Sequence, residues 1–430
     1  MQDLGHWTAG DWMLLPESEI ALPGVIVGAS GSGKTETELR IAYGAAASYR
    51  WQVVFVDGKG DHATAARFLA AMRQAGVSPA RLKMFPAAAF NGWNGDGQAL
   101  LNRLMEVVDH TEPYYEAVAQ VVLSLALKAP TIGLPSSSQD LLRRLNVGVL
   151  TSLYQQQPLE LAKLQGLHAK EAMGVIYRYD GFFGALDGKL DGAWSYEDVD
   201  AAYLLLDGLA LKNEAARLGR YLVEDFASYV VKRKPRDRRT LLIIDEYSAL
   251  QMKTSAVNLA ERLRSYGATV IVSAQSYEGL GRDDEAQRLL GAANFLILHR
   301  TNNPFKLSSR AGMEQRTETR WSLDLARPTS YGAASVRPRY KIEPEQVMGL
   351  HNGEAFVISR GERLKIRVAQ IAVSAQEMAT SETFMQQEEQ ADQQRQQAAG
   401  GVLPPLPQAS VQKAKPSPVK KQAKKGGNAP

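Results

Sequence analysis

The sequence predicts an α/β protein with a mostly parallel central sheet, an all-helical insertion and a disordered, basic C-terminal tail. Three observations support this prediction. Short apolar runs alternate with helical patterns over the first 85 residues and again from residue 240, which is typical of parallel strands joined by helices. The stretch between these regions shows helical patterns and no convincing strand over 98–232. After residue 400 proline and lysine dominate, as in disordered segments.

The first half of the predicted sheet contains three strands. Apolar runs at 25–27 and 51–57 are separated by a helical pattern over 37–48, the spacing of a βαβ unit. A helix over 62–75 then leads to a third strand over 81–85.

The middle of the chain is predicted to be an all-helical insertion. Leu141, Leu145 and Leu150 have helical spacing, and a long amphipathic pattern follows over 218–230. Ser195 and Asp198 have the spacing of a capping box, which predicts the start of an apolar helix.

The sheet is expected to resume in the second half. The predicted elements are strands over 240–245, 269–273 and 295–298, helices over 254–265 and 284–290, and closing antiparallel strands over 318–323, 355–358 and 365–368. The glutamine-rich stretch 377–399 is predicted as a fraying helix that begins the tail. The predicted divisions are an N-terminal lead-in over 1–19, a core over 20–134 and 216–376, the helical insertion over 135–215 and a disordered tail over 377–430.

Composition excludes several classes of site. The chain of 430 residues has no cysteine, so disulfides, thiolate nucleophiles and cysteine metal sites are excluded. Its six histidines are scattered without metal-ligand spacing. The N-terminus lacks a signal-peptide pattern, and the longest apolar run, 118–127, is too short to span a bilayer. These features predict a cytoplasmic protein.

The positive charge is concentrated in the tail. Residues 411–430 carry six lysines and no acid. The positive charge of this segment therefore exceeds the net charge of +4 for the whole chain. The rest of the chain is therefore slightly acidic. Lysine runs usually serve solubility, but they also neutralise nucleic-acid phosphates, and the sequence leaves both roles open.

A phosphate-binding loop follows the first predicted strand. Its residues are Gly28, Ala29, Ser30, Gly31, Ser32, Gly33, Lys34 and Thr35, which match GxxxxGK[ST]. In such loops the glycines let backbone N–H groups point at a phosphate chain, and the helix N-terminus adds its positive dipole end. Lys34 is expected to reach the β- and γ-phosphates and Thr35 to ligate Mg²⁺. The loop therefore predicts a nucleotide site.

A second segment, which ends in two acidic residues, predicts hydrolysis of the nucleotide. The apolar strand over 240–245 ends in Asp245 and Glu246. Asp245 is expected to hold Mg²⁺ opposite Thr35, and Glu246 to orient or deprotonate the attacking water. The glutamate distinguishes a hydrolase from a nucleotide-regulated switch.

Three further residues have two interpretations each. Gln275 leaves the next strand at the edge where ligands bind, so it is either a sensor of the γ-phosphate or a turn residue. Arg264 ends a helix and is either an arginine finger for a neighbouring subunit or a solvated surface residue. Lys59, in the segment Asp57-Gly58-Lys59-Gly60-Asp61, either touches a phosphate or a neighbouring subunit or belongs to a tight turn.

These segments together resemble the FtsK/HerA superfamily of hexameric DNA motors, and more closely the coupling-protein branch of type IV secretion and conjugation. The segments that carry the resemblance are 28–35, 56–61, 243–246 and 264–276. The helical insertion resembles the all-α domain of that branch. The likeness spans about 20–370.

The resemblance implies a RecA-like P-loop ATPase core that forms a ring, most often a hexamer, and uses ATP and Mg²⁺ to move DNA. It implies Walker A roles for Lys34 and Thr35, Walker B roles for Asp245 and Glu246, a sensor role for Gln275 and a trans arginine role for Arg264. A relaxase or another transfer protein is the implied partner.

One feature departs from the family. Coupling proteins usually have an N-terminal transmembrane pair, whereas 27 residues precede Gly28 here. Either a partner recruits the motor to the inner membrane, or the motor is purely soluble as in the HerA branch. Two other functions stay open: a secretion ATPase that acts on protein substrates, and a nucleotide-gated DNA-binding adaptor, against which Glu246 argues.

Overall fold

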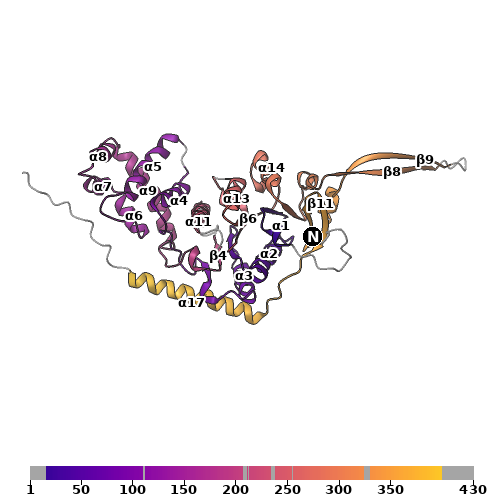
Figure 1. Ribbon diagram of the computed structural model, residues 1–430, viewed down its shortest axis with the longest axis horizontal. Coiled ribbons are helices and arrows are strands. Elements are labelled where there is room, and N and C mark those ends of the chain that lie inside the picture. Colours follow the sequence, from indigo (N-terminus) through magenta and orange to yellow (C-terminus); the bar gives the residue numbers. More distant parts are fainter. Residues whose placement is uncertain are drawn as a thin grey trace, which may run out of the picture.

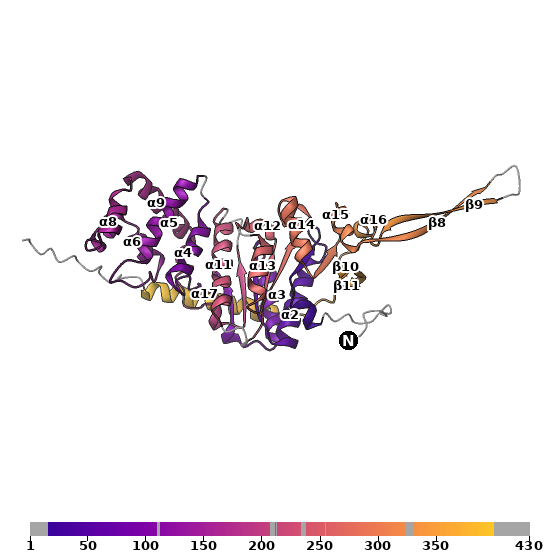
Figure 2. The same cartoon turned by 45° about the horizontal axis from the view of Figure 1, so that its top comes forward.

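The computed structural model describes residues 16–109, 112–206, 211, 213–233, 238–253, 255–323 and 330–399, with only the backbone described at 318–323, 330–334 and 399. The lysine-rich tail and most of the lead-in therefore lie outside the described residues. A nine-stranded sheet forms the centre, in the order β11-β10-β7-β1-β6-β5-β2-β4-β3 (Figures 1 and 2). The strands are β1 (Gly24–Val27), β2 (Gln52–Asp57), β3 (Leu82–Phe85), β4 (Ala201–Leu205), β5 (Thr240–Asp245), β6 (Ala268–Ala274), β7 (Phe295–His299), β10 (Glu354–Ser359) and β11 (Glu362–Arg367).

The sheet is mostly parallel, as predicted. All pairings from β7 to β3 are parallel, and β10 and β11 close one edge in antiparallel fashion. Parallel strands are covered on both faces and read as continuous apolar runs. The carboxyl ends of β1, β6, β5 and β2 consequently share one edge of the sheet.

Strand β4 corrects the prediction that 98–232 contains no strand. Its five residues are all buried between β2 and β3, and the Tyr203 ring stacks on Phe55 with centroids 5.0 Å apart. Alanine and leucine have high helix propensity, so the sequence Ala-Ala-Tyr-Leu-Leu gives little local indication of a strand. The predicted capping box at Ser195 leads only into a 3-10 turn, Tyr196–Asp198, and not into a long helix.

Helices pack on both faces of the sheet. On one face, helices α2 (Lys34–Tyr49) and α3 (His62–Gln74) cover Val53 and Phe55 of β2. On the other face, Val54 and Val56 belong to a cluster with α11 (Asn213–Lys232), α12 (Tyr247–Leu250), α13 (Ala256–Arg264) and α14 (Asp283–Ala292). The alternation along β2 is the period-2 pattern of a strand buried on both sides. Short helices α1 (Glu17–Ile20), α15 (Phe305–Ser308) and α16 (Pro344–Met348) connect these elements.

The helical insertion forms a lobe at one end of the molecule (Figure 1). Its helices are α4 (Gly97–Val107), α5 (Pro113–Leu127), α6 (Ser138–Arg144), α7 (Val147–Leu153), α8 (Pro158–Gln165) and α9 (Ala169–Leu186). The predicted bounds of 135–215 are wrong at both ends, because α4 and α5 pack in the same lobe as α9 and β4 belongs to the sheet. A buried ion pair between Arg103 of α4 and Asp225 of α11 joins the lobe to the core.

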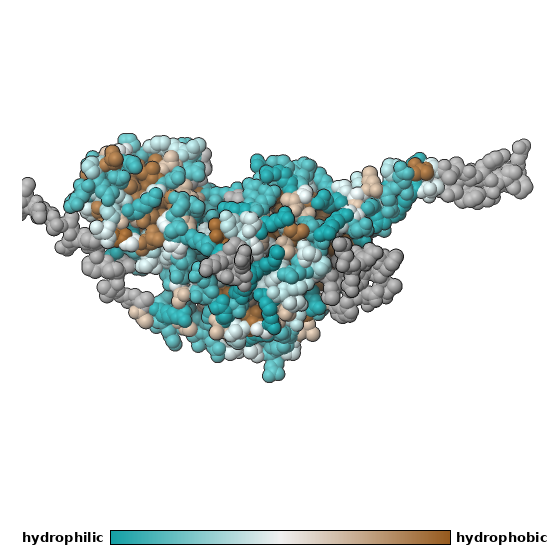
Figure 3. Space-filling view, viewed as in Figure 1, coloured by the Kyte–Doolittle hydropathy of each residue, from teal (hydrophilic) through white to brown (hydrophobic). Residues whose placement is uncertain are grey.

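The surface of the lobe differs from that of the core. In Figure 3 most of the visible surface is hydrophilic, and brown surface is concentrated at the lobe. Val121, Leu159 and Met173 are among its exposed apolar side chains. Within the described ranges, no helix combines the length and apolar character needed to cross a membrane.

Strands β8 (Met313–Leu323) and β9 (Ser330–Tyr340) form a separate antiparallel arm. The arm projects from the end of the molecule opposite the lobe (Figures 1 and 2). Its base is closed by the Lys341 N–H, which donates to Gly312 O at 2.9 Å. The prediction that 318–323 helps to close the main sheet is therefore wrong, whereas the other two predicted closing strands correspond to β10 and β11.

Helix α17 (Ala375–Ala399) confirms the predicted helix over 377–399 and corrects only its assignment to a disordered tail. It packs on α3 and runs toward the lobe (Figure 1). Lys83 Nζ of β3 lies 3.0 Å from the Glu388 carboxylate, and Lys189 Nζ, just beyond α9, lies 3.0 Å from Asp392. These specific contacts make α17 part of the folded core rather than a fraying extension.

Candidate functional site

The phosphate-binding loop lies between β1 and α2 and requires glycine at two positions for different reasons. A Cβ on Gly28 would lie 2.4 Å from His299 Cβ and 2.6 Å from Ser32 Oγ, so only glycine fits without displacement. Gly33 has φ +113°, in the region that side chains disfavour. The loop therefore has the close-packed, curled backbone of a phosphate cradle.

The start of α2 has the donors that an anion needs. Gly33 is the N-cap of this 16-residue helix and supplies no side-chain cap, so the first N–H groups and the positive end of the helix dipole are available. Lys34 is 7% exposed, and its ammonium donates to Gly28 O at 2.7 Å. Ser32 Oγ is buried without a hydrogen-bond partner among the described residues. Loop, lysine and unpartnered hydroxyl together fit a phosphate group, and Thr35 stands next to Lys34 at the start of the helix.

The acidic strand β5 ends at the same edge as the loop. Strand β6 lies between β1 and β5, pairing Val27 with Ala274 and Ile244 with Val272. Since neighbouring strands are about 4.8 Å apart, β5 lies about 10 Å from β1. Asp245 accepts hydrogen bonds from the Ser273 hydroxyl at 2.6 Å and from the Glu246 N–H at 2.8 Å. Burial raises the pKa of Asp245 above its usual value.

Glu246 and Gln275 contact each other directly. Gln275 Nε2 donates to Glu246 Oε2 at 2.9 Å, and the Ser248 hydroxyl donates to Oε1 at 3.2 Å. Glu246 also has φ +55°, a conformation that costs energy for a residue with a side chain and tends to occur at functional sites. The backbone at the end of β5 is thus arranged so that this carboxylate meets the amide at the end of β6.

The segment 57–61 is a turn organised by Asp57. Its Oδ1 accepts the N–H groups of Lys59 and Gly60 at 2.8 and 3.0 Å, and its Oδ2 accepts the Asp61 N–H at 2.9 Å. The Tyr203 hydroxyl donates to the same Oδ2 at 2.8 Å. Of the two interpretations of this segment, the tight turn is what the structure shows, while the side chain of Lys59 is exposed.

Arg264 lies away from its own nucleotide loop. It is exposed in the last turn of α13, and its carbonyl accepts the Gly267 N–H just before β6 begins. Because β6 is parallel to β1, Arg264 stands at the amino end of the strands, whereas the loop stands at their carboxyl ends. Any role in nucleotide chemistry would therefore be in a neighbouring subunit.

His299, at the end of β7, is not among the site residues predicted from the sequence. Its Nδ1 lies 2.9 Å from Glu354 O and its Nε2 lies 2.8 Å from Thr37 Oγ1. A carbonyl oxygen only accepts, so Nδ1 carries the proton and Nε2 accepts from the Thr37 hydroxyl. Burial lowers the pKa of His299 to about 4. This neutral ring joins α2 to β7 and β10.

Glu38 of α2 was also missed. It is fully buried, and neither of its carboxylate oxygens has a hydrogen-bond partner in the described part of the chain. Burial, followed by the nearby charge of Asp245, raises the pKa of Glu38 well above its usual range. Its position four residues after Lys34 was the available signal, because such spacing puts both on one helix face.

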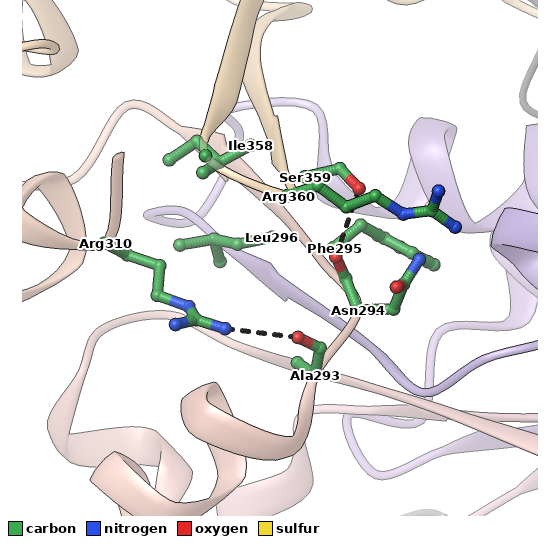
Figure 4. A pocket seen from close by; sticks show the side chains of 9 residues that line it. Ala293, Asn294, Phe295, Leu296, Arg310, Ile358, Ser359 and Arg360 are labelled. Atoms are coloured by element: carbon green, nitrogen blue, oxygen red, sulfur yellow. Dashed lines mark hydrogen bonds between the residues drawn. The ribbon is translucent and has the colours of Figure 1, made fainter. Parts of the chain in front are cut away.

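A cavity of about 140 Å³ lies elsewhere, at the amino end of β7 (Figure 4). Ala293, Asn294 and Phe295 line one side, and Ser359 and Arg360 the other. Ser359 Oγ donates to Asn294 O at 3.2 Å. Since β7 runs from this cavity toward His299, the cavity is not part of the nucleotide site.

Comparison with known proteins gives structural matches. No protein-family profile matches the chain, and no curated protein sequence matches it. The unbound monoclinic form of the bacterial conjugative coupling protein TrwBdeltaN70 superposes with a TM-score of 0.62 at 16% identity, covering 84% of this chain and 87% of that one. The plasmid coupling protein TrwB in complex with ADP and Mg²⁺ gives a TM-score of 0.60 at 15% identity, covering 84% and 88%.

A third structure, VirB4 of Thermoanaerobacter pseudethanolicus, gives a TM-score of 0.53 at 14% identity, covering 83% of this chain and 90% of that one. At these identities the likeness establishes the fold. The predicted α/β architecture with its P-loop core is therefore confirmed, and this chain shares it with a conjugative coupling protein.

Proposed function

We propose that this protein is an ATP-hydrolysing DNA translocase that assembles as a ring, most simply a hexamer, and couples or pumps DNA during conjugative or mobile-element transfer. The observation that carries the hydrolytic part is the contact between Glu246 and Gln275 at the sheet edge that holds the phosphate loop. The DNA-transfer part is supported by the four segments that resemble those of coupling proteins and by the fold shared with TrwB.

The residues of the site have complementary roles in this proposal. Lys34 and the N-terminal N–H groups of α2 bind the phosphates of ATP. The Thr35 hydroxyl and the Asp245 carboxylate would hold Mg²⁺, which neutralises charge on the β- and γ-phosphates. The Ser273 hydroxyl orients Asp245 through its hydrogen bond.

Glu246 is the proposed general base. Its carboxylate takes a proton from the water that attacks the γ-phosphate, and the Gln275 amide keeps that carboxylate at the sheet edge. Gln275 also reports the state of the nucleotide to β6, since it directly follows that strand. Arg264 is proposed to act on the nucleotide of the next subunit in the ring.

The partners follow from the transfer role. DNA is the proposed substrate of movement, a relaxase or another transfer protein the proposed source of that DNA, and a further protein the proposed link to the inner membrane. The protein itself is proposed to work on the cytoplasmic side.

The test measures ATP hydrolysis with and without single- and double-stranded DNA, together with the mass in the same buffer. DNA should stimulate the wild type, and Lys34→Ala should abolish nucleotide binding. Glu246→Gln should bind ATP but hydrolyse it about 10²–10⁴-fold more slowly, whereas Glu261→Gln, at an exposed position of α13, should behave as wild type. A rate indifferent to both DNA forms would refute translocation and favour a protein substrate. Normal turnover by Glu246→Gln would refute the assigned base.

A further inference from the structure

The buried carboxylate of Glu38 has no assigned role in the chemistry above. Its residue is 0% exposed, and both carboxylate oxygens are without a hydrogen-bond partner among the described residues. Burying an acid without partners is unfavourable. Such a group therefore needs a reason that the protein fold alone does not supply.

The position of Glu38 points to the phosphate and metal side of α2. It lies three residues after Thr35 and four after Lys34, so all three project from neighbouring parts of one helix face. The charged groups that act on it are Asp245, Lys34 and Asp57. Glu38 is thus an acid beneath the phosphate loop, beside the end of β5.

Burial raises the pKa of Glu38, and the Ser273 hydroxyl lies near enough to oppose that rise, but the hydrogen bond it makes goes to Asp245. The Ser273 hydroxyl has one proton, and it donates that proton to Asp245 at 2.6 Å. The Lys34 ammonium is directed to Gly28 O at 2.7 Å. The single Ser273 proton is therefore engaged, and the Lys34 ammonium, which has two further protons, makes no hydrogen bond to Glu38. The acceptor capacity of Glu38 is available for donors that come with a ligand.

We propose that Glu38 is a third acidic residue of the Mg²⁺ site, a positioning residue that accepts hydrogen bonds from water bound to the ion held by Thr35 and Asp245. This inference rests on the proposed nucleotide site. Mg²⁺ retains several of its waters in protein sites, and these waters are donors that require acceptors. Outer-shell acceptors of this kind change metal affinity by about 10–100-fold when removed.

The test compares the affinity for ADP with Mg²⁺ and with EDTA, measured by titration calorimetry. Glu38→Gln should lose about 10–100-fold in affinity for ADP with Mg²⁺ and keep its affinity for ADP in EDTA. Glu36→Gln is the matched control, because Glu36 lies on the same helical turn but pairs with Arg67, and it should change neither affinity. Asp245→Asn should lose the effect of Mg²⁺.

A second variant covers the case in which Glu38→Gln fails to fold. Glu38→Met keeps the volume and removes the buried acid, so it should fold and should show the same loss of the Mg²⁺ effect. A full Mg²⁺ effect in either folded variant would overturn the proposal and leave Glu38 as an inert buried acid. Failure of the wild type to bind ADP at all would instead refute the nucleotide site itself.

Discussion

Acidification should weaken the fold through His299, because its buried ring stays neutral while the unfolded chain takes up a proton. The ring is 0% exposed and its pKa is lowered to about 4 by burial, against an ordinary value of 6.5. Its Nε2 accepts from Thr37, and its Nδ1–H donates to Glu354 O. Protonation at Nε2 would turn this acceptor into a donor and leave the Thr37 hydroxyl only the Gly33 carbonyl, 3.2 Å away, as an acceptor.

The sign and size follow from proton linkage. Above pH 6.5 both states hold a neutral ring, so the full stability is present, and it is lost as the pH falls from 6.5 toward 4. At pH 5.0 the ring is mostly protonated in the unfolded chain and mostly neutral in the folded one. The loss between pH 7.5 and 5.0 is about 2 kcal/mol, and the limiting loss below pH 4 is about 3.4 kcal/mol.

Urea unfolding at a series of pH values measures this effect. His299→Gln removes the titrating ring and keeps an acceptor, so the difference in unfolding free energy between wild type and variant should shrink by about 2 kcal/mol from pH 7.5 to 5.0. His62→Gln, at an exposed position at the start of α3, should follow the wild type throughout. A difference that stays constant with pH in His299→Gln would refute the reasoning.

Three other perturbations have expected outcomes. Gly28→Ala places a Cβ within 2.6 Å of loop and β7 atoms, so nucleotide affinity measured by calorimetry should fall at least tenfold while the circular dichroism spectrum is retained. Asp225→Ala leaves the buried guanidinium of Arg103 without its carboxylate and should cost about 3–5 kcal/mol in urea unfolding; an unchanged midpoint would contradict this. Replacing the arm between Gly312 and Lys341 by two glycines preserves the bond that closes its base, so the melting temperature of the body should change by less than about 2 °C, and a large drop would show that the arm supports the core.

The sequence predicted those strands of the sheet whose signals lie in one continuous stretch of the chain. The phosphate loop, the strand that ends in Asp245 and the strand before Gln275 each combine an apolar run with polar residues at its end, and all three occur as expected. Strand β4 was not predictable in this way, because its alanines and leucines suit a helix and only its place between β2 and β3 makes it a strand. Helix α17 has the composition of a disordered segment, and the residues that it contacts, among them Lys83 and Lys189, lie far away in the chain.

The residues of the candidate site also divide into those that the sequence predicted and those that it did not. The contact between Glu246 and Gln275 joins residues from two adjacent strands, and the sequence predicted that both strands end at one edge. His299 and Glu38 have ordinary sequence surroundings, and their neutral or unpartnered state depends on burial by distant residues. The neutral state of His299 and the lack of partners at Glu38 depend on the tertiary structure, so no local sequence pattern predicts them.

The place of β1 in the sheet also determines when the nucleotide site can form during synthesis. Among the described strands its neighbours are β6 and β7, although β1 ends at Val27 and β6 ends at Ala274. About 250 residues separate them, which corresponds to about 12–50 s of translation at about 5–20 residues per second. A nascent chain thus carries its phosphate loop for most of its synthesis without a sheet to hold it. Nucleotide binding then requires a chain that has been synthesised at least through β7, which ends at His299.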